Sequence, residues 1–142
     1  MRLWHKDLIP FLPRQQLLGQ WRECCLIAKS IAEKGTPNHL LVNKIMDYPP
    51  THFIMYVDIV FSEMAGRNYH AAWSKCLEYF SEEELACYCF GKSISLDELF
   101  KDWHNDRYMH QCLLNLQEKY DCGGISEEEY RILVDNTVIE DL

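Results

Sequence analysis

Apolar side chains recur at every third or fourth position between Pro13 and Gly35, which is the pattern of an amphipathic helix. The stripe consists of Leu17, Trp21, Cys24 or Cys25, Ala28 and Ile31. A second pattern of this kind begins at Pro50, where the missing amide donor suits the first turn of a helix, and ends near Gly66. These two patterns predict two long helices in the N-terminal half of the chain.

Capping boxes indicate further helices, because a Ser side chain and the Glu three residues later can bind each other's free backbone N–H groups. Three such boxes begin at Ser81, Ser95 and Ser126, and a long helical pattern from about Asp106 to Tyr120 stops before Gly123-Gly124. No stretch alternates apolar and polar residues as a strand would, and no repeat or low-complexity linker divides the chain. We therefore predict a single all-α domain over residues 1–142, with six or seven helices.

Length and composition are those of an ordinary globular protein. The 142 residues are 48% hydrophobic and 25% charged, and they contain no apolar segment long enough for a membrane span and no signal-peptide core. The seven cysteines include no CxxC pair, so we expect free thiols, with Cys24-Cys25 and Cys87-x-Cys89 packed as small core residues. We expect a cytoplasmic protein without membrane contact, metal site or other cofactor.

Charge is distributed unevenly along the chain. The net charge of −8 argues against a nucleic-acid binder as a whole. Residues 1–46, however, contain seven basic and three acidic side chains, a net charge of +4, whereas residues 71–142 contain six basic and sixteen acidic ones, a net charge of −10. We therefore expect only the N-terminal part to hold a polyanion, with the acidic C-terminal half on the opposite face.

The amino terminus and the first helix are the candidate site, because the motifs of phosphate loops, zinc proteases, EF-hands and serine hydrolases are absent from the sequence. Apolar residues can anchor the start of the chain, and an anchored α-amine is useful because α-amines are less basic than lysine side chains. Glu23 on the polar side of the first helix could move protons for such an amine, while Arg22 holds a phosphate. The alternative interpretation is that both side chains belong to a solvated helix face.

The segment Gln16-Leu17-Leu18-Gly19-Gln20-Trp21-Arg22-Glu23 resembles the pyrimidine-dimer DNA glycosylase family, which has a Leu, a small or acidic residue, an aromatic residue and then Arg-Glu in this place. Arg2 is similar to the Arg just after the family's start, and a looser similarity covers residues 52–69. About the first 70 residues are involved. The opening of the chain also resembles bacterial, largely uncharacterised proteins grouped with this family.

The resemblance implies a DNA glycosylase that also acts as an abasic-site lyase. In the family the α-amine attacks the anomeric carbon of the sugar, displaces the damaged base and forms a Schiff base, after which β-elimination cuts the strand. Carried over to this chain, the nucleophile is the amine of Met1, and Glu23 is the acid/base residue. The substrate implied is double-stranded damaged DNA with an extruded nucleotide.

The resemblance also implies the residues that contact DNA. Arg2 and Arg22 would bind phosphates, Gln15 would contact the nucleotide, and His52 would lie near the imine. The chain departs from the family in having Leu26 in place of a second arginine and in lacking a basic C-terminal tail, and its Met1 is expected to be retained.

We expect a monomer. The alternative functions are a non-catalytic helical module that binds nucleic acid or a basic protein partner, and an enzyme that uses the same amine on another nucleotide-like or sugar substrate.

Overall fold

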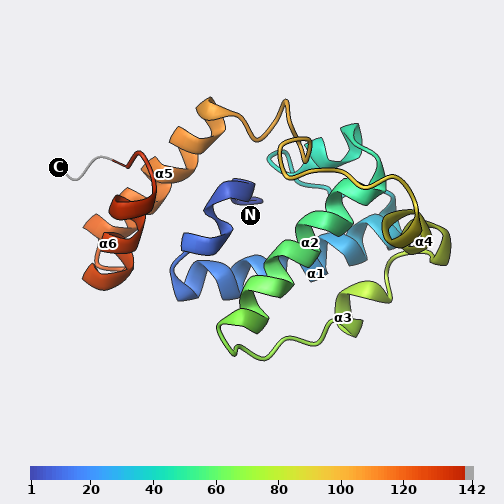
Figure 1. Ribbon diagram of the computed structural model, residues 1–142, viewed down its shortest axis with the longest axis horizontal. Coiled ribbons are helices and arrows are strands. Elements are labelled where there is room, and N and C mark those ends of the chain that lie inside the picture. Colours follow the sequence, from blue (N-terminus) through green and yellow to red (C-terminus); the bar gives the residue numbers. More distant parts are fainter. Residues whose placement is uncertain (140–142) are drawn as a thin grey trace.

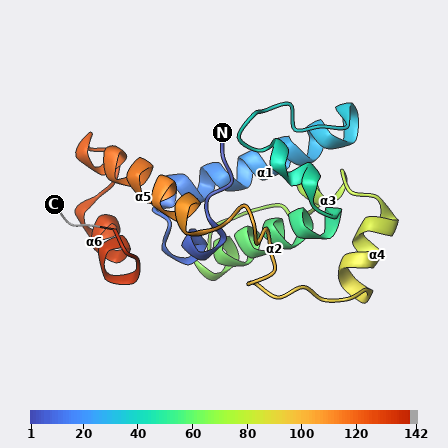
Figure 2. The same ribbon diagram turned by 90° about the horizontal axis from the view of Figure 1, so that it is seen from above.

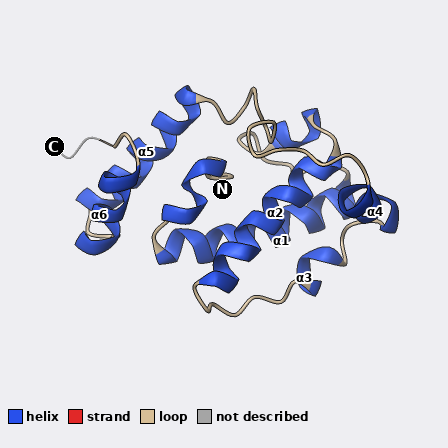
Figure 3. Cartoon of the chain, in the orientation of Figure 1, coloured by secondary structure: helices blue, strands red, loops and turns tan. Residues whose placement is uncertain are grey.

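The computed structural model of the chain describes residues 1–139 and is built from helices (Figure 1). The α-helices are α1 (Arg14–Lys34), α2 (Pro50–Gly66), α3 (Ser74–Leu77), α4 (Glu82–Phe90), α5 (Asp106–Asp121) and α6 (Glu127–Asn136); the 3₁₀ helices are η1 (Lys6–Phe11) and η2 (Asn43–Asp47). No strand occurs in this described part, as Figure 3 shows. The prediction of an all-α fold is confirmed. Within the same residues, no helix is both long and apolar enough to cross a membrane.

Most helix ends lie where the local sequence places them. Helix α1 ends at Gly35, whose φ of 76° is left-handed and whose N–H binds the carbonyl of Ile31. A left-handed backbone suits glycine because it has no Cβ. The capping boxes at Ser81 and Ser126 are both formed and begin α4 and α6.

The capping box at Ser95 does not begin a helix, contrary to the prediction. The N–H of Glu98 binds the Ser95 hydroxyl at 3.3 Å, but residues 96–103 form a series of turns. Phe100 interrupts any helix with a left-handed φ of 48°. Leu99 and Phe100 are fully buried, so their packing in the core outweighs the local preference for a helix.

One cluster of buried apolar side chains connects the N-terminal segment with α1, α2, α5 and α6. Leu3, Leu8 and Ile9 of the N-terminal segment are fully buried in it. Helix α4, by contrast, buries no side chain. Cys87 and Cys89 are therefore exposed, which corrects the expectation that they pack in the core.

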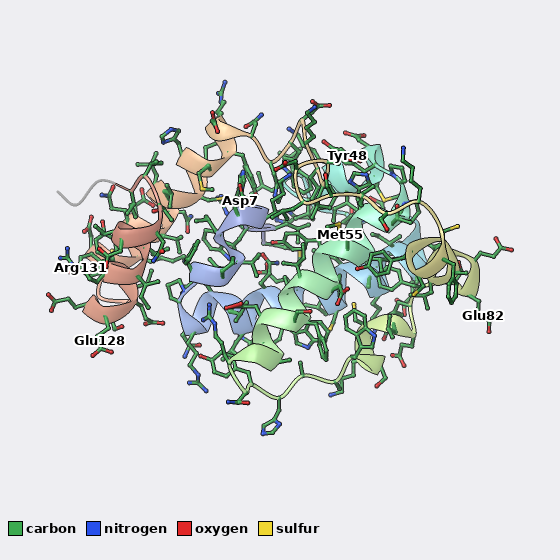
Figure 4. All side chains as sticks on the ribbon, in the orientation of Figure 1. Asp7, Tyr48, Met55, Glu82, Glu128 and Arg131 are labelled. Carbon is green, nitrogen blue, oxygen red and sulfur yellow. The ribbon has the colours of Figure 1, made fainter. Side chains whose placement is uncertain are left out.

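The N-terminal segment lies between α5 on one side and the pair α1–α2 on the other (Figure 1). In Figure 2 the N-terminal end reaches the upper edge of the molecule, while α4 and α6 lie toward the lower edge at opposite ends. Figure 4 shows Glu82 and Glu128, which belong to the two acidic runs, at these distant ends. One acid of the second run is close to the basic part, however, because Glu129 accepts the N–H of Arg14 at the start of α1 at 2.7 Å.

Candidate active site

Gln20 of α1 binds the backbone of the N-terminal segment through hydrogen bonds. Its side chain is 1% exposed; Oε1 accepts the N–H of Trp4 at 2.7 Å, and Nε2 donates to the carbonyl of Arg2 at 3.1 Å. The Tyr56 hydroxyl of α2 lies 2.6 Å from the Trp4 carbonyl and 3.0 Å from Gln20 Oε1, so both oxygens share its proton. Burial raises the pKa of Tyr56 well above its usual value, which keeps this hydroxyl a donor.

Helix α5 holds the same segment from the other side. The Tyr108 hydroxyl donates to the carbonyl of Leu3, and Arg2 Nη1 lies 3.7 Å from Cys112 Sγ, one helical turn further along. Burial raises the pKa of Tyr108, so this hydroxyl also remains protonated. The start of the chain is therefore clamped between α1 and α2 on one side and α5, much later in the sequence, on the other.

The clamp brings Arg2 and Glu23 together. The backbone N–H of Arg2 lies 3.4 Å from Glu23 Oε2. Since one residue spans at most about 3.6 Å, the α-amine nitrogen of Met1 lies within about 7 Å of that oxygen. Met1 is 43% exposed and Glu23 is half-buried, so a substrate has access to both groups.

For the other predicted site residues, the structure shows no hydrogen bond with the N-terminal segment within residues 1–139. Arg22 is exposed on α1 beside Glu23, and its guanidinium lies on the side of the helix where Gly19 is placed. Gln15 is exposed in the first turn of α1, about 12 Å along the helix axis from Glu23.

His52 at the start of α2 is half-buried, and its contacts are with aromatic rings. Its Nδ1 accepts the N–H of Phe100 at 3.2 Å, and its ring lies against Tyr48 and Phe100. Burial lowers the pKa of His52, which favours the neutral acceptor form that this hydrogen bond needs.

Lys6 and His104 are anchoring residues that reasoning from the sequence did not select. The Lys6 N–H binds His104 Nδ1 at 2.9 Å, and Lys6 Nζ donates to the carbonyls of Leu96, Asp97 and Leu99. An ammonium has three donors, so all of them are used here. Burial lowers the pKa of Lys6, and its carbonyl partners are about ninety residues away, where no local pattern could reveal them.

Gln20, in contrast, could have been found from the sequence. It lies three residues after Leu17 and four before Cys24, within the apolar stripe of the first helix. A polar residue in such a stripe must find hydrogen-bond partners inside the protein. This signal points to an internal anchor, although it does not identify the partners.

The groups gathered at the N-terminal end can perform proton transfer and nucleophilic attack. A neutral amine can attack an electrophilic carbon, a neighbouring carboxylate can accept or donate a proton, and the guanidinium groups of Arg2 and Arg22 can bind anions. Within residues 1–139 no three His, Cys, Asp or Glu side chains gather as a metal site would require.

Comparison with known proteins places this site in a described family. The family model of pyrimidine dimer DNA glycosylase matches residues 1–75. The match covers just over half of the chain and includes η1, α1, η2 and α2, and with them the contact between Arg2 and Glu23. No curated protein and no solved structure matches the chain.

Proposed function

The chain belongs to the pyrimidine dimer DNA glycosylase family, and on this premise we propose that it removes a damaged pyrimidine from double-stranded DNA and then cuts the strand at the abasic site. The α-amine of Met1 is the nucleophile and Glu23 is the acid/base residue. The observation that carries this assignment is the 3.4 Å contact between the Arg2 N–H and Glu23 Oε2, which keeps the α-amine close to a carboxylate.

The proposed reaction begins when the neutral amine attacks C1′ of the deoxyribose of an extruded nucleotide. The bond between C1′ and the base breaks, and the base leaves with the electron pair and takes up a proton. Loss of a proton from the amine and opening of the sugar ring give a Schiff base at C1′. Removal of a proton from C2′ then breaks the C3′–O bond, the phosphate leaves, and water hydrolyses the imine.

Glu23 serves these steps as a carboxylate close to the amine. It stabilises the opened sugar and assists removal of the C2′ proton, because a general base has to lie within hydrogen-bond reach of the proton it takes, directly or through one water molecule. The clamp formed by Gln20, Tyr56 and Tyr108 supports this role, since it holds the backbone next to Met1 in a fixed position. A fixed nucleophile reacts faster than a mobile one.

Arg2 and Arg22 bind the phosphates on either side of the extruded nucleotide. Arg22 is exposed, and the Arg2 guanidinium carbon lies 5.3 Å from the centre of the Trp4 ring, which limits its movement. Guanidinium groups suit phosphate because they donate paired hydrogen bonds. Gln15 contacts the DNA further along α1, and His52 contributes near the sugar.

Lys6 is the amine that competes most directly with Met1 for this role, because it lies in the same segment. Lys6 is a buried residue, 6% exposed, and its Nζ donates to three carbonyls, so this amine is not free to attack a carbon. The proposal therefore predicts that a covalent adduct forms on residue 1 and not on residue 6.

Borohydride trapping on a duplex with one abasic site tests the proposal. We expect a covalent protein–DNA adduct, which peptide mass spectrometry places on the N-terminal residue. Glu23→Gln should reduce strand cleavage by at least about a hundredfold, as expected for loss of a general acid/base, with DNA affinity unchanged or slightly higher. Glu33→Gln, on an exposed residue of the same helix, is the control and should behave like the wild type.

Three outcomes would contradict the proposal. An adduct on a lysine would remove Met1 from the mechanism, and DNA binding without any adduct would indicate the non-catalytic module. Activity on abasic DNA without base removal from pyrimidine-dimer DNA would indicate another substrate. A chain extended by one residue before Met1 should lose most of the activity, because the amine moves by up to about 3.5 Å.

A further inference from the structure

A polar pocket is lined by residues of η2, of the start of α5 and of the segment before α5. It is open to solvent and has a volume of about 360 Å³. Its walls combine two cations, two amides and two aromatic rings, and they contain no carboxylate: Lys44, Trp103, Asn105, Arg107, Tyr108 and Gln111. In a protein with a net charge of −8, a pocket with this lining is suited to an anion.

Three of these side chains present exposed polar groups to a ligand. Asn105 is the N-cap of α5, because its Oδ1 accepts the N–H of Tyr108 at 2.9 Å, and the Tyr108 hydroxyl already donates to Leu3. Lys44, Arg107 and Gln111 are exposed, and among the described residues neither Lys44 nor Arg107 forms an ion pair. Their donors are therefore directed to solvent.

The three available groups come from two walls of the pocket. Arg107 and Gln111 lie one turn apart on the same face of α5, whereas Lys44 is supplied by η2. A planar guanidinium can donate two parallel hydrogen bonds to a phosphate, an ammonium adds a point charge, and an amide adds a further donor. The chemistry of these donors suits a phosphate group.

Tyr108 connects this pocket with the N-terminal site. Its ring forms part of the pocket wall, and its hydroxyl binds the carbonyl of Leu3, two residues from Met1. In the same helix, Cys112 contacts the Arg2 guanidinium. A DNA strand that reaches Met1 can therefore continue over α5 into the pocket.

We propose that Lys44, Arg107 and Gln111 form a phosphate clamp. It binds one backbone phosphate of the DNA strand beside the reacting nucleotide. This inference rests on the proposed function, since it takes DNA as the ligand. Arg107 and Gln111 lie beyond the family-matched residues 1–75 and within the acidic part of the chain, so neither the family match nor the regional charge points to them. The clamp supplies phosphate contacts to a chain that has Leu26 in place of an arginine.

Salt-dependent binding to an undamaged duplex tests the clamp, with fluorescence anisotropy as the readout. The double variant Lys44→Ala/Arg107→Ala should bind more weakly, and the slope of log K against log salt should fall by about one, because both residues bind the same phosphate and each phosphate contact contributes about 0.9. The control Lys92→Ala/Lys119→Ala removes the same charge from exposed positions outside the pocket and should leave the slope close to that of the wild type. The charge-preserving Lys44→Arg/Arg107→Lys should retain most of the slope.

Equal slopes for the pocket variant and the control variant would overturn the clamp. It would also be overturned if inorganic phosphate raised the Tm of the wild type but not of the pocket variant while the DNA slope stayed unchanged, because the pocket would then serve a free anion. Failure of the proposed function has a different signature. Suppose that neither the wild type nor the pocket variant forms a borohydride adduct, but the pocket variant still has a smaller salt dependence of DNA binding. The phosphate clamp then stands, and the chemistry assigned to Met1 is wrong.

Discussion

The N-terminal segment, residues 1–12, lies in the core of the protein, whereas helix α4 lies at its edge, and different forces order the two regions. The segment has weak local signals, and its backbone is held by hydrogen bonds with Gln20, Tyr56, Tyr108 and His104. Helix α4 has a complete capping box at Ser81 and buries no side chain.

The difference shows that local helix signals and tertiary importance are separate properties. A capping box satisfies backbone groups within four residues, so it needs no contact with the rest of the protein. The N-terminal segment instead depends on partners from α1, α2 and α5, so the loss of any of these contacts should weaken its order. Mutations in the two regions should therefore have different consequences for activity.

Gln20→Leu should have the largest effect, because it leaves buried partners in the N-terminal segment without hydrogen bonds. We expect a loss of about 3 kcal/mol in unfolding free energy and at least a tenfold lower rate of borohydride trapping. Gln16→Leu is the matched control: Gln16 Oε1 is buried without a hydrogen-bond partner, so its replacement should cost little. Urea denaturation and single-turnover trapping measure both effects, and equal losses in the two variants would contradict the anchoring role.

Acid should weaken the N-terminal segment through His104. Burial above all, and then the nearby His5 and Lys6, lower the pKa of His104 from 6.5 to about 2. Below pH 6.5 this histidine therefore binds a proton in the unfolded chain but not in the folded chain. The unfolding free energy falls as the pH decreases, by at most about 1.4 kcal/mol per pH unit for this group.

The measurement is the unfolding free energy at pH 7 and pH 5 for the wild type and His104→Asn, which keeps an acceptor for the Lys6 N–H. We expect the variant to lose less stability than the wild type between these two pH values. His70→Asn, on an exposed residue, should keep the wild-type pH dependence. The assignment fails if His104→Asn keeps it as well.

Two tyrosines allow a direct test of the comparison by removal of one hydroxyl. Tyr108→Phe leaves the Leu3 carbonyl without its donor and should cost about 1–2 kcal/mol together with a several-fold loss of trapping. Tyr88→Phe in α4 removes a 2.6 Å hydrogen bond to Asp58 and should leave trapping unchanged. A similar loss of trapping in both variants would mean that the Tyr108 hydrogen bond to the N-terminal segment has no special role in the reaction.

Ser81→Ala should have the smallest effect on activity. The loss of the N-cap costs about 1 kcal/mol, and this cost falls on α4 alone, because the helix buries no side chain. Hydrogen exchange should become faster in α4 while the N-terminal segment keeps its protection and trapping is unchanged. Faster exchange in both regions would show that α4 supports the site after all.

The sequence by itself determined the features that are decided within a few residues. The bounds of α1 and α2 follow from Pro13, Gly35 and Pro50 together with the helical period, because capping and periodicity act over one or two turns. The family resemblance selected Arg2 and Glu23, which the structure brings into contact. At Ser95 the same local reasoning failed, because burial of Phe100 in a left-handed conformation outweighs a capping box.

Only the tertiary structure decided which distant residues meet the start of the chain. Tyr108 and Cys112 reach Leu3 and Arg2 because α5 packs beside the N-terminal segment, and Glu129 of α6 binds the N–H of Arg14, for which Pro13 supplies no side-chain cap. Helix placement depends on how the whole core packs, and packing is a property of side chains that lie far apart along the chain. No pattern within one segment contains that information.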